Sequence, residues 1–278
     1  MESTVLTLLL FLLVPELESP WLIIRGDDMG FSHSGNLAIR DCYRDGIVTT
    51  VEVIVPSPWF PEAVKMLAES DVDVGIHLAL SSEWENIKWR PVSQVPSLVD
   101  ENGYLFPMIF KNKNYPRRSL IEQSWQLSEI EKEFRAQIEL GKKHIPRVSH
   151  LSGHMGCPQL SPQVRELYRK LAKEYQLDIH PEDYGVQNIS YQGKHVTISE
   201  KWDSFMKLLD TLQPGKTYLF VEHPGYDDAE LRAIHHVGYE NVAQDRQGVT
   251  DLFLDARIKA VMEQKKIKRI SYKDLTKK

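Results

Sequence analysis

Cysteine is scarce in this chain of 278 residues, which contains Cys42 and Cys157 and no other cysteine. The two lie far apart in sequence and form no CxxC motif, so a disulfide scaffold and a cysteine-based metal or redox module are both excluded. A basic excess is missing as well, because 34 Lys and Arg stand against 39 Asp and Glu, for a formal net charge of −5. Proteins that bind a phosphate backbone normally show the opposite balance, so we expect no nucleic-acid partner.

Long hydrophobic runs are also missing, apart from residues 5–14 (VLTLLLFLLV). This run is too short to cross a bilayer, which takes about 18 to 20 residues, but it has the length of a signal-peptide core. Glu2 precedes it where a basic segment is typical, and no small-x-small cleavage site follows it. We therefore interpret residues 1–20 as a signal peptide or an N-terminal extension. The protein is secreted or periplasmic in the first case and cytoplasmic in the second, and we expect no membrane span.

The composition of the chain is that of a globular protein, with 42% hydrophobic and 26% charged residues. This balance excludes a disordered, collagen-like or coiled-coil protein. No internal repeat, low-complexity stretch or flexible linker divides residues 21–278, and their length suits one large α/β domain. We therefore predict a single domain over residues 21–278.

Short β-branched apolar runs alternate with amphipathic segments along this domain. The predicted strands cover residues 21–24, 47–55, 72–80, 147–150, 177–180, 218–221 and 269–272, and the predicted helices cover residues 34–45, 61–70, 128–143, 161–175 and 251–264. Ser128 and Glu131 form a predicted capping box for one of these helices. The alternation predicts a parallel sheet, and this many units predicts a distorted, TIM-like β/α barrel, closed or nearly closed. The aperiodic residues 81–116 predict a long loop, which we expect to cover a site.

Polar residues follow several of the predicted strands at the point where each strand ends. They are Asp27, Asp28, His77, His150, His154, Glu222 and His223. Because the carboxyl ends of all strands open on one face of a β/α barrel, we expect these side chains to converge there. Carboxylate and imidazole groups form the ligand set of a divalent metal such as Zn²⁺, and a catalytic site uses three protein ligands. Asp28, His77 and His154 are the three ligands we predict.

Each of these motifs also has a simpler interpretation. Consecutive aspartates after a strand are often only a turn or a helix cap, and a lone histidine such as His77 in an apolar strand is more often a core residue. His150 and His154 are spaced so that both could lie on one helical face, although Gly153 between them weakens a helix. Position at the strand ends, more than the number of histidines, favours the metal site.

The two aspartates can divide the chemical work by environment. A carboxylate bound to a cation stays ionised, and a second one nearby can take a proton from water. We therefore assign Asp28 to the metal and Asp27 to the role of general base. His223 is the candidate general acid for the leaving group. The predicted reaction class is metal-assisted hydrolysis.

Six motifs together resemble the YdjC/ChbG-type carbohydrate deacetylases. They are residues 25–32 (RGDDMGFS), 46–50 (GIVTT), 74–78 (VGIHL), 96–103 (PSLVDENG), 149–154 (SHLSGH) and 223–225 (HPG). Their order and approximate spacing match the family from Trp21 to Leu275. Many family members carry further histidines after the H-x-x-x-H motif, where this chain has Met155 and Gly156, so the loop there lines a different subsite.

The resemblance implies a distorted β/α barrel similar to the polysaccharide deacetylases, and a hydrolase that removes acetyl groups from chitooligosaccharide-like sugars. It implies that a water held by a divalent metal, Zn or Mg before other ions, attacks the amide of an N-acetylated oligosaccharide. By motif, Asp28, His77 and His154 are metal ligands and Asp27 is the base. His150 is implied to be either a fourth metal ligand or a group beside the ligands, and the sequence leaves both open.

The long loop offers substrate contacts in Trp84, Trp89 and Arg90. Flat apolar rings suit the C–H faces of sugars, although these aromatics could equally be tucked over the barrel mouth. Arg246 could clamp an anion or a carbonyl in the site, although a surface salt bridge is the commoner role of a lone arginine.

Two other functions compete with deacetylation. A glycoside hydrolase would use two carboxylates on either side of a glycosidic bond, here Asp27 and Glu222. A catalytically inactive carbohydrate-binding barrel would keep the fold without the chemistry. The presence of all the proposed acid, base and metal groups favours the deacetylase over the binding protein.

Overall fold

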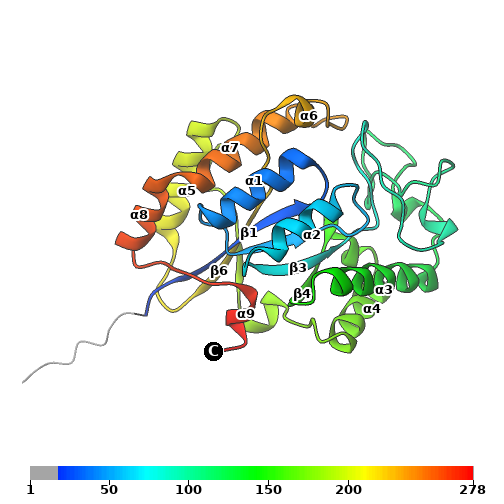
Figure 1. The fold of residues 1–278 in the computed structure, drawn as a ribbon, viewed down its shortest axis with the longest axis horizontal. Helices are drawn as coiled ribbons and strands as arrows, with labels where there is room; N and C mark the ends of the chain where they lie inside the picture. Colours follow the sequence, from blue (N-terminus) through cyan, green and yellow to red (C-terminus); the bar gives the residue numbers. More distant parts are fainter. Residues whose placement is uncertain (1–17, 278) are drawn as a thin grey trace, which may run out of the picture.

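A parallel β-sheet forms the centre of this computed structural model, which describes residues 18–277 (Figure 1). The strands are β1 (Trp21–Met29), β2 (Thr50–Val53), β3 (Asp73–Leu78), β4 (His150–Gly153), β5 (Gln187–Ile189), β6 (Thr217–Glu222) and β7 (Lys268–Arg269). They run in the order β4-β3-β2-β1-β6-β5, and β7 pairs with the start of β1. Every pairing is parallel.

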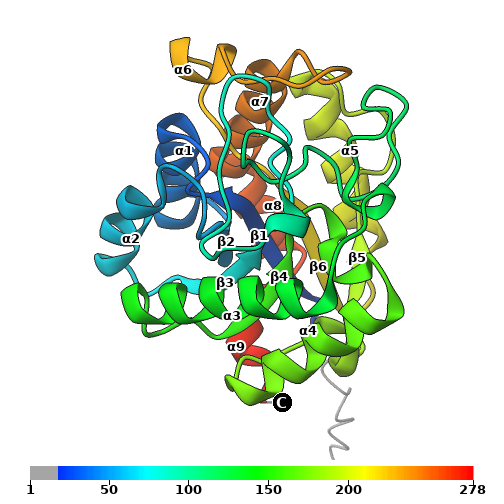
Figure 2. The same ribbon diagram turned by 90° about the vertical axis from the view of Figure 1, so that its right-hand side faces the viewer.

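Helices pack around this sheet, most of them on its outside. They are α1 (His33–Arg44), α2 (Phe60–Ala68), α3 (Leu127–His144), α4 (Pro162–Glu174), α5 (Ile198–Thr211), α6 (Ala229–Arg232), α7 (Val242–Leu254), α8 (Ala256–Gln264) and α9 (Tyr272–Leu275). Figure 2 shows the sheet curling inside this layer, with the long segment between β3 and α3 crossing over one end. Among the described strands β4 and β5 do not pair, so the sheet is a curled half-barrel. The predicted distorted β/α barrel, a single α/β domain, is confirmed.

Several predicted boundaries were wrong in ways that have local causes. β1 runs on through residues 25–28, predicted as a polar loop, because Arg25 and Gly26 pair with both β2 and β6 and Met29 pairs again with β2. The helix predicted over residues 251–264 is two helices, because Asp255 ends α7 and caps α8 with its own side chain. The capping box predicted at Ser128 is absent, since α3 begins one residue earlier.

Two of the predicted strands were also misplaced. The strand expected at residues 177–180 is irregular, and β5 lies further along the chain at Gln187–Ile189. The strand expected to end at His150 instead begins there, as β4. Residues 1–17, which hold most of the predicted signal peptide, lie outside the described residues, so that interpretation stays a prediction. Within residues 18–277 no helix combines the length and apolarity that a bilayer crossing needs.

The apolar side chains form two cores, one on each face of the sheet. Leu22 and Ile24 of β1 belong to the large core between the sheet and the helices, while Ile23 between them faces the barrel interior. The inner core is small, and Tyr272 and Leu275 of α9 complete it. Much of the remaining barrel interior is therefore left to polar side chains.

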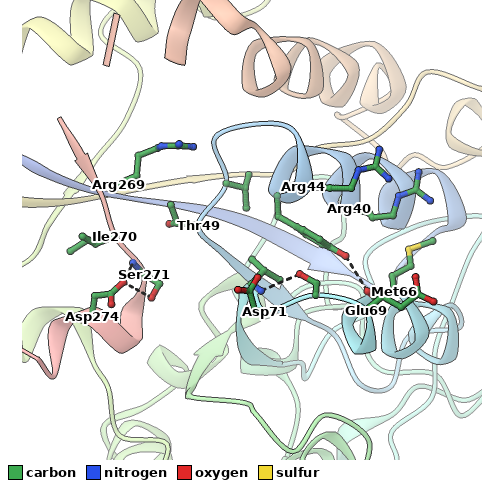
Figure 3. A pocket seen from close by; sticks show the side chains of 14 residues that line it. Arg40, Arg44, Thr49, Met66, Glu69, Asp71, Arg269, Ile270, Ser271 and Asp274 are labelled. Carbon is green, nitrogen blue, oxygen red and sulfur yellow. Dashed lines mark hydrogen bonds between the residues drawn. The ribbon is translucent and has the colours of Figure 1, made fainter. Parts of the chain in front are cut away.

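A cavity of about 590 Å³ opens at the amino ends of the strands, where its lining includes Thr49 and Val72, the residues just before β2 and β3 (Figure 3). Charged side chains of both signs line it, namely Arg40, Arg44, Glu69, Asp71, Arg269 and Asp274. In β/α barrels the amino end of the strands contributes to stability, and the chemistry lies at the carboxyl end. This cavity is therefore separate from the site that the sequence predicts.

Tyr272 closes the lower part of the barrel interior. Its side chain is 1% exposed, its ring stacks on His150 at 3.7 Å, and its hydroxyl accepts a hydrogen bond of 2.9 Å from Arg25 Nη1. We expect Tyr272→Ala to lower the free energy of unfolding by about 3 to 5 kcal/mol, because it leaves a cavity beneath the polar interior. Tyr272→Phe keeps the stack and should cost only about 1 kcal/mol. Urea unfolding measures both, and equal losses would contradict this role of the ring.

Candidate active site

Asp28, His77 and His154 lie together at the carboxyl ends of β1, β3 and β4. One potential ligand atom from each lies within 4.8 Å of the others. The residues are 2%, 3% and 4% exposed. The convergence that the sequence predicts for these side chains is therefore present in the structure. We refer to them as the triad.

The backbone at Asp28 decides how the triad forms. Neighbouring residues of a regular strand point to opposite faces, but the register of β1 against β2 shifts between Gly26 and Met29, and Asp28 has a left-handed φ of 70°. As a result both aspartates face the same imidazole. His77 Nε2 lies 3.7 Å from Asp27 Oδ2 and 3.7 Å from Asp28 Oδ1.

The two carboxylate oxygens of Asp28 have different surroundings. Oδ2 accepts a hydrogen bond of 2.9 Å from Arg246 Nη2. Oδ1 lies 3.2 Å from His154 Nδ1 but has no hydrogen-bond partner, although it is buried. Burial alone would raise the pKa of the Asp28 carboxyl, but His154, His223 and Arg246 hold that pKa well below its usual range.

The unpartnered oxygen is a test of whether the triad suits a cation. A buried carboxylate oxygen without a hydrogen-bond partner is costly, and it faces His77 Nε2 and His154 Nδ1, two nitrogens that supply lone pairs when unprotonated. One carboxylate and two imidazoles form a donor set that suits Zn²⁺ and several other divalent ions. The residues present therefore fit a divalent metal.

His154 lies between two carboxylates. Its Nδ1 faces Asp28, and its Nε2 lies 3.0 Å from Glu83 Oε2. Burial by itself lowers the pKa of His154, but Glu83 and Asp28 outweigh it and raise that pKa to about 10. Glu83 comes from the long loop after β3, and no feature of the sequence distinguishes it there from other acidic residues such as Glu85 and Glu101.

Asp27 is held by Arg25. The guanidinium donates from Nε to Oδ1 at 2.7 Å and from Nη2 to Oδ2 at 2.8 Å, so both carboxylate oxygens are engaged. Burial raises the pKa of Asp27 above its usual value, against the opposing effects of Arg25 and His223. The candidate base therefore lies beside the triad with its orientation set by two hydrogen bonds.

His223 lies on the open side of the triad. It follows β6, its Nε2 is 3.9 Å from Asp28 Oδ2, and its side chain is 40% exposed. Next to His154, Met155 is 36% exposed, and the exposed Phe110 lies against Gly156. These are the side chains that a molecule approaching the triad meets first.

His150 does not face the triad. Its Nε2 contacts Glu52 at 2.6 Å and its Nδ1 contacts Ser149 at 2.7 Å, so neither ring nitrogen is left for a shared ion. His150 begins strand β4 and His154 follows its end, so the two do not share a helix, and four steps along a strand separate them by about 13 Å. Of the two alternatives for His150, this arrangement favours a group beside the ligands, because His150 is not brought together with the triad.

A buried carboxylate that the sequence did not single out lies beneath the triad. Glu52 in β2 is fully buried. Burial by itself raises its pKa, but His150 and Arg25 lower that pKa to about 2, so Glu52 is ionised. The sequence does mark Glu52, because it is the single charged residue in the apolar run of residues 47–55.

The aromatic residues of the long loop are buried over the barrel mouth and do not offer free faces. Trp84 is 2% exposed and packs between Phe31 and His236, with ring centroids 5.9 and 5.5 Å away. Trp89 is 3% exposed and donates a hydrogen bond of 2.9 Å to Ser81 O. Of the two interpretations of these rings, the structure favours packing over the barrel mouth and disfavours contact with substrate. Apolar rings are more stable packed on one another than exposed to water.

Of the two arginines named from the sequence, Arg246 lies in the site, one of the two places that the sequence left open, and Arg90 does not. Arg90 is exposed and contacts its own loop, lying over the ring of Tyr104 at 4.4 Å and donating to Asn102 O at 3.3 Å. Arg246 is 3% exposed and pairs with Asp28, so it forms no surface salt bridge. Its Nε and Nη1 are buried without hydrogen-bond partners, and its guanidinium lies over Phe31 at 4.4 Å.

Glu222 points away from Asp27. It shares a face of β6 with Phe220, whose ring packs on Phe205 of α5 and Phe253 of α7. Burial raises the pKa of Glu222 to about 7, with Lys201 opposing the shift. Two carboxylates on opposite faces cannot flank one glycosidic bond, so the arrangement disfavours the glycoside hydrolase.

A model of the YdjC-like protein family matches residues 21–264. The chain belongs to the YdjC-like family. Among its relatives, a carbohydrate deacetylase of Geobacillus stearothermophilus is 26% identical over 273 residues, which cover 92% of this chain and 98% of that protein. Carbohydrate deacetylase 2 of Listeria innocua is 25% identical over 266 residues, and the match covers 92% of this chain and 99% of that protein.

A solved structure supports the fold of this YdjC-like protein. It comes from Enterococcus faecalis and is provisionally assigned as a cellobiose-phosphate cleavage protein. Its TM-score is 0.70 at 22% identity, and the match covers 93% of this chain and 99% of that one. The resemblance drawn from the motifs is confirmed at the level of the family, and the relatives' names agree with the enzyme class that the motifs imply.

Glu222, whose side chain is 19% exposed, should make the stability of this YdjC-like protein depend on pH. Its pKa rises from 4.5 to about 7 on folding, so its contribution is fully present below pH 4.5 and is lost as the pH rises through 7. Glu222→Gln carries no charge at any pH and should exceed the wild type in free energy of unfolding by about 1 to 3 kcal/mol at pH 8. Near pH 4.5 the two should be similar.

Urea unfolding at pH 4.5 and pH 8 measures this difference. Glu166→Gln, on the exposed side of α4, is the matched control and should show no such change with pH. A Glu222→Gln variant that is less stable than the wild type at pH 8 would contradict the burial effect.

Proposed function

We propose that this protein is a carbohydrate deacetylase that hydrolyses the N-acetyl group of chitooligosaccharide-like sugars with the help of a divalent metal. One observation carries the proposal: the buried, unpartnered Asp28 Oδ1 faces His77 and His154, while Asp27 and His223 lie on either side. The names of the curated relatives support deacetylation of a carbohydrate.

Asp28, His77 and His154 would hold the metal, with Zn²⁺ or Mg²⁺ as the first candidates. A divalent cation there would acidify a water molecule and polarise the amide carbonyl. The remaining chemistry belongs to the side chains of the chain itself.

Asp27 is the general base in this proposal. Its carboxylate takes the proton of the attacking water, and the raised pKa makes it a better acceptor than Asp28. Arg25 holds both oxygens, so the carboxylate stays oriented while it changes charge. The opposite pKa shifts of two neighbouring aspartates are the pattern expected when one binds a cation and the other moves a proton.

His223 is the general acid. It donates a proton to the leaving amine of the sugar, and its exposure places it where a substrate enters. The triad itself is nearly closed to solvent, which strengthens its electrostatic effect on the amide.

Acetate release tests the activity. Purified protein should release acetate from N-acetylglucosamine oligosaccharides, lose this activity with a chelator and regain it with Zn²⁺ or Mg²⁺. An Asp28→Asn, His154→Ala double variant should lose at least about 100-fold, because it removes two of three ligands. Cleavage of the sugar chain without acetate release, or sugar binding without turnover that a chelator leaves unchanged, would contradict the proposal.

The role of Asp27 has a separate signature. Asp27→Asn should lower kcat by about 10² to 10⁴-fold with a small change in KM, and the metal content should stay at the wild-type level, because a base is lost and a ligand is not. Asp203→Asn, at an exposed position of α5, is the matched control and should keep full activity. Loss of the metal from Asp27→Asn would instead make Asp27 a ligand.

A further inference from the structure

A chain of hydrogen bonds runs from the triad into the barrel interior. His77 Nδ1 lies 2.6 Å from Ser152 Oγ in β4. Ser152 Oγ in turn donates to Glu52 Oε2, and Glu52 Oε1 lies 2.6 Å from His150 Nε2. Three strands, β2, β3 and β4, contribute these four side chains, which are at most 7% exposed.

The chemistry of the groups sets the direction of each hydrogen bond. An ionised carboxylate only accepts, so Ser152 must donate its hydroxyl proton to Glu52. The oxygen of Ser152 then remains as the acceptor for a proton on His77 Nδ1. With Nδ1 protonated, the lone pair of His77 lies on Nε2, the nitrogen that faces Asp27 and Asp28.

We propose that Glu52, acting through Ser152, is a positioning residue that holds His77 in the tautomer whose Nε2 lone pair faces the centre of the triad. The inference deepens the proposed function, because that lone pair is what a cation at the triad would bind. An imidazole that binds a metal commonly donates its other N–H to such a partner, which fixes the ring and its tautomer.

The barrel is built to make room for this chain. Gly75 lies opposite His150 in the pairing of β3 with β4. A Cβ at Gly75 would lie 2.3 Å from Glu52 Oε2 and 2.5 Å from His150 Nε2, so no larger residue fits beside the pair. Tyr272 stacks on His150 from the other side. Gly75 therefore leaves room for the Glu52 carboxylate, and Tyr272 packs the His150 ring against it.

A purely structural role for Glu52 is the competing explanation. The buried hydrogen bond between Glu52 and His150 could stabilise the fold without affecting His77, since leaving a buried polar group without its partner is costly in any protein. The two explanations differ at Ser152, because only a positioning role requires its hydroxyl to accept the proton of His77.

The experiment therefore uses Ser152. Ser152→Ala removes the acceptor and should weaken the binding of Zn²⁺ by about 10 to 100-fold, measured by competition with a chromophoric chelator. Ser152→Thr restores a hydroxyl and should bind within about threefold of the wild type, since Ser152 borders a crevice of about 250 Å³ that can take a methyl group. Ser204→Ala, which removes an equally buried hydroxyl in α5, should leave Zn²⁺ binding unchanged.

A second measurement reads the tautomer directly in the metal-free protein. Nitrogen-15 chemical shifts of labelled histidine should show His77 protonated on Nδ1 in the wild type and in Ser152→Thr, and a shift toward Nε2 protonation in Ser152→Ala. An unchanged tautomer together with unchanged Zn²⁺ affinity in Ser152→Ala would overturn the inference. If the wild type binds no divalent ion, the proposed function fails, and the tautomer measurement still decides the role of Glu52 and Ser152.

Discussion

In a regular strand, neighbouring side chains point to opposite faces of the sheet, yet Asp27 and Asp28 both face His77. The irregular register of β1 and the left-handed backbone of Asp28 are what turn them to the same point. Without that irregularity one aspartate would face the helix layer, and the triad would lose either its carboxylate or the base beside it. The whole arrangement of the site depends on this short stretch of backbone.

Two arginines then give the neighbouring aspartates different properties. Arg25 holds both oxygens of Asp27 from within the same strand, whereas Arg246 of α7 takes a single oxygen of Asp28 and leaves the other unpartnered. The pKa of Asp27 is raised and that of Asp28 is lowered. The two aspartates are neighbours in β1, so the difference between their pKa values comes from the side chains packed around them.

The interior of the half-barrel is unusually polar, and this explains its other features. Its apolar core is small, and the space toward the carboxyl ends holds Arg25, Glu52 and His150 as well as the triad. Buried charged groups need polar partners. Arg25 finds its partner two residues along the same strand, in Asp27, and Glu52 finds its partner on a different strand, in His150. The rings of the long loop cover the mouth above, which keeps the triad away from bulk water.

The alternation of strands with helices, the barrel class and the placement of Asp28, His77 and His154 at strand ends followed from the sequence alone, whereas helix α5 was not predicted. Local apolar patterns and the parallel arrangement of strands carry that information, and they are largely independent of side-chain packing. The boundaries within residues 177–189 and 251–264 did not follow, because pairing and a single capping residue decide them.

Only the tertiary structure decided which atoms face one another. His150 and Glu52 stand 98 positions apart, and His77 and Ser152 stand 75 apart, so no local pattern could join them. The same holds for Trp84, whose burial depends on rings from distant segments. Sequence motifs name residues that converge on one end of a barrel, but the direction of each side chain is set by strand register and by the neighbours that it packs against.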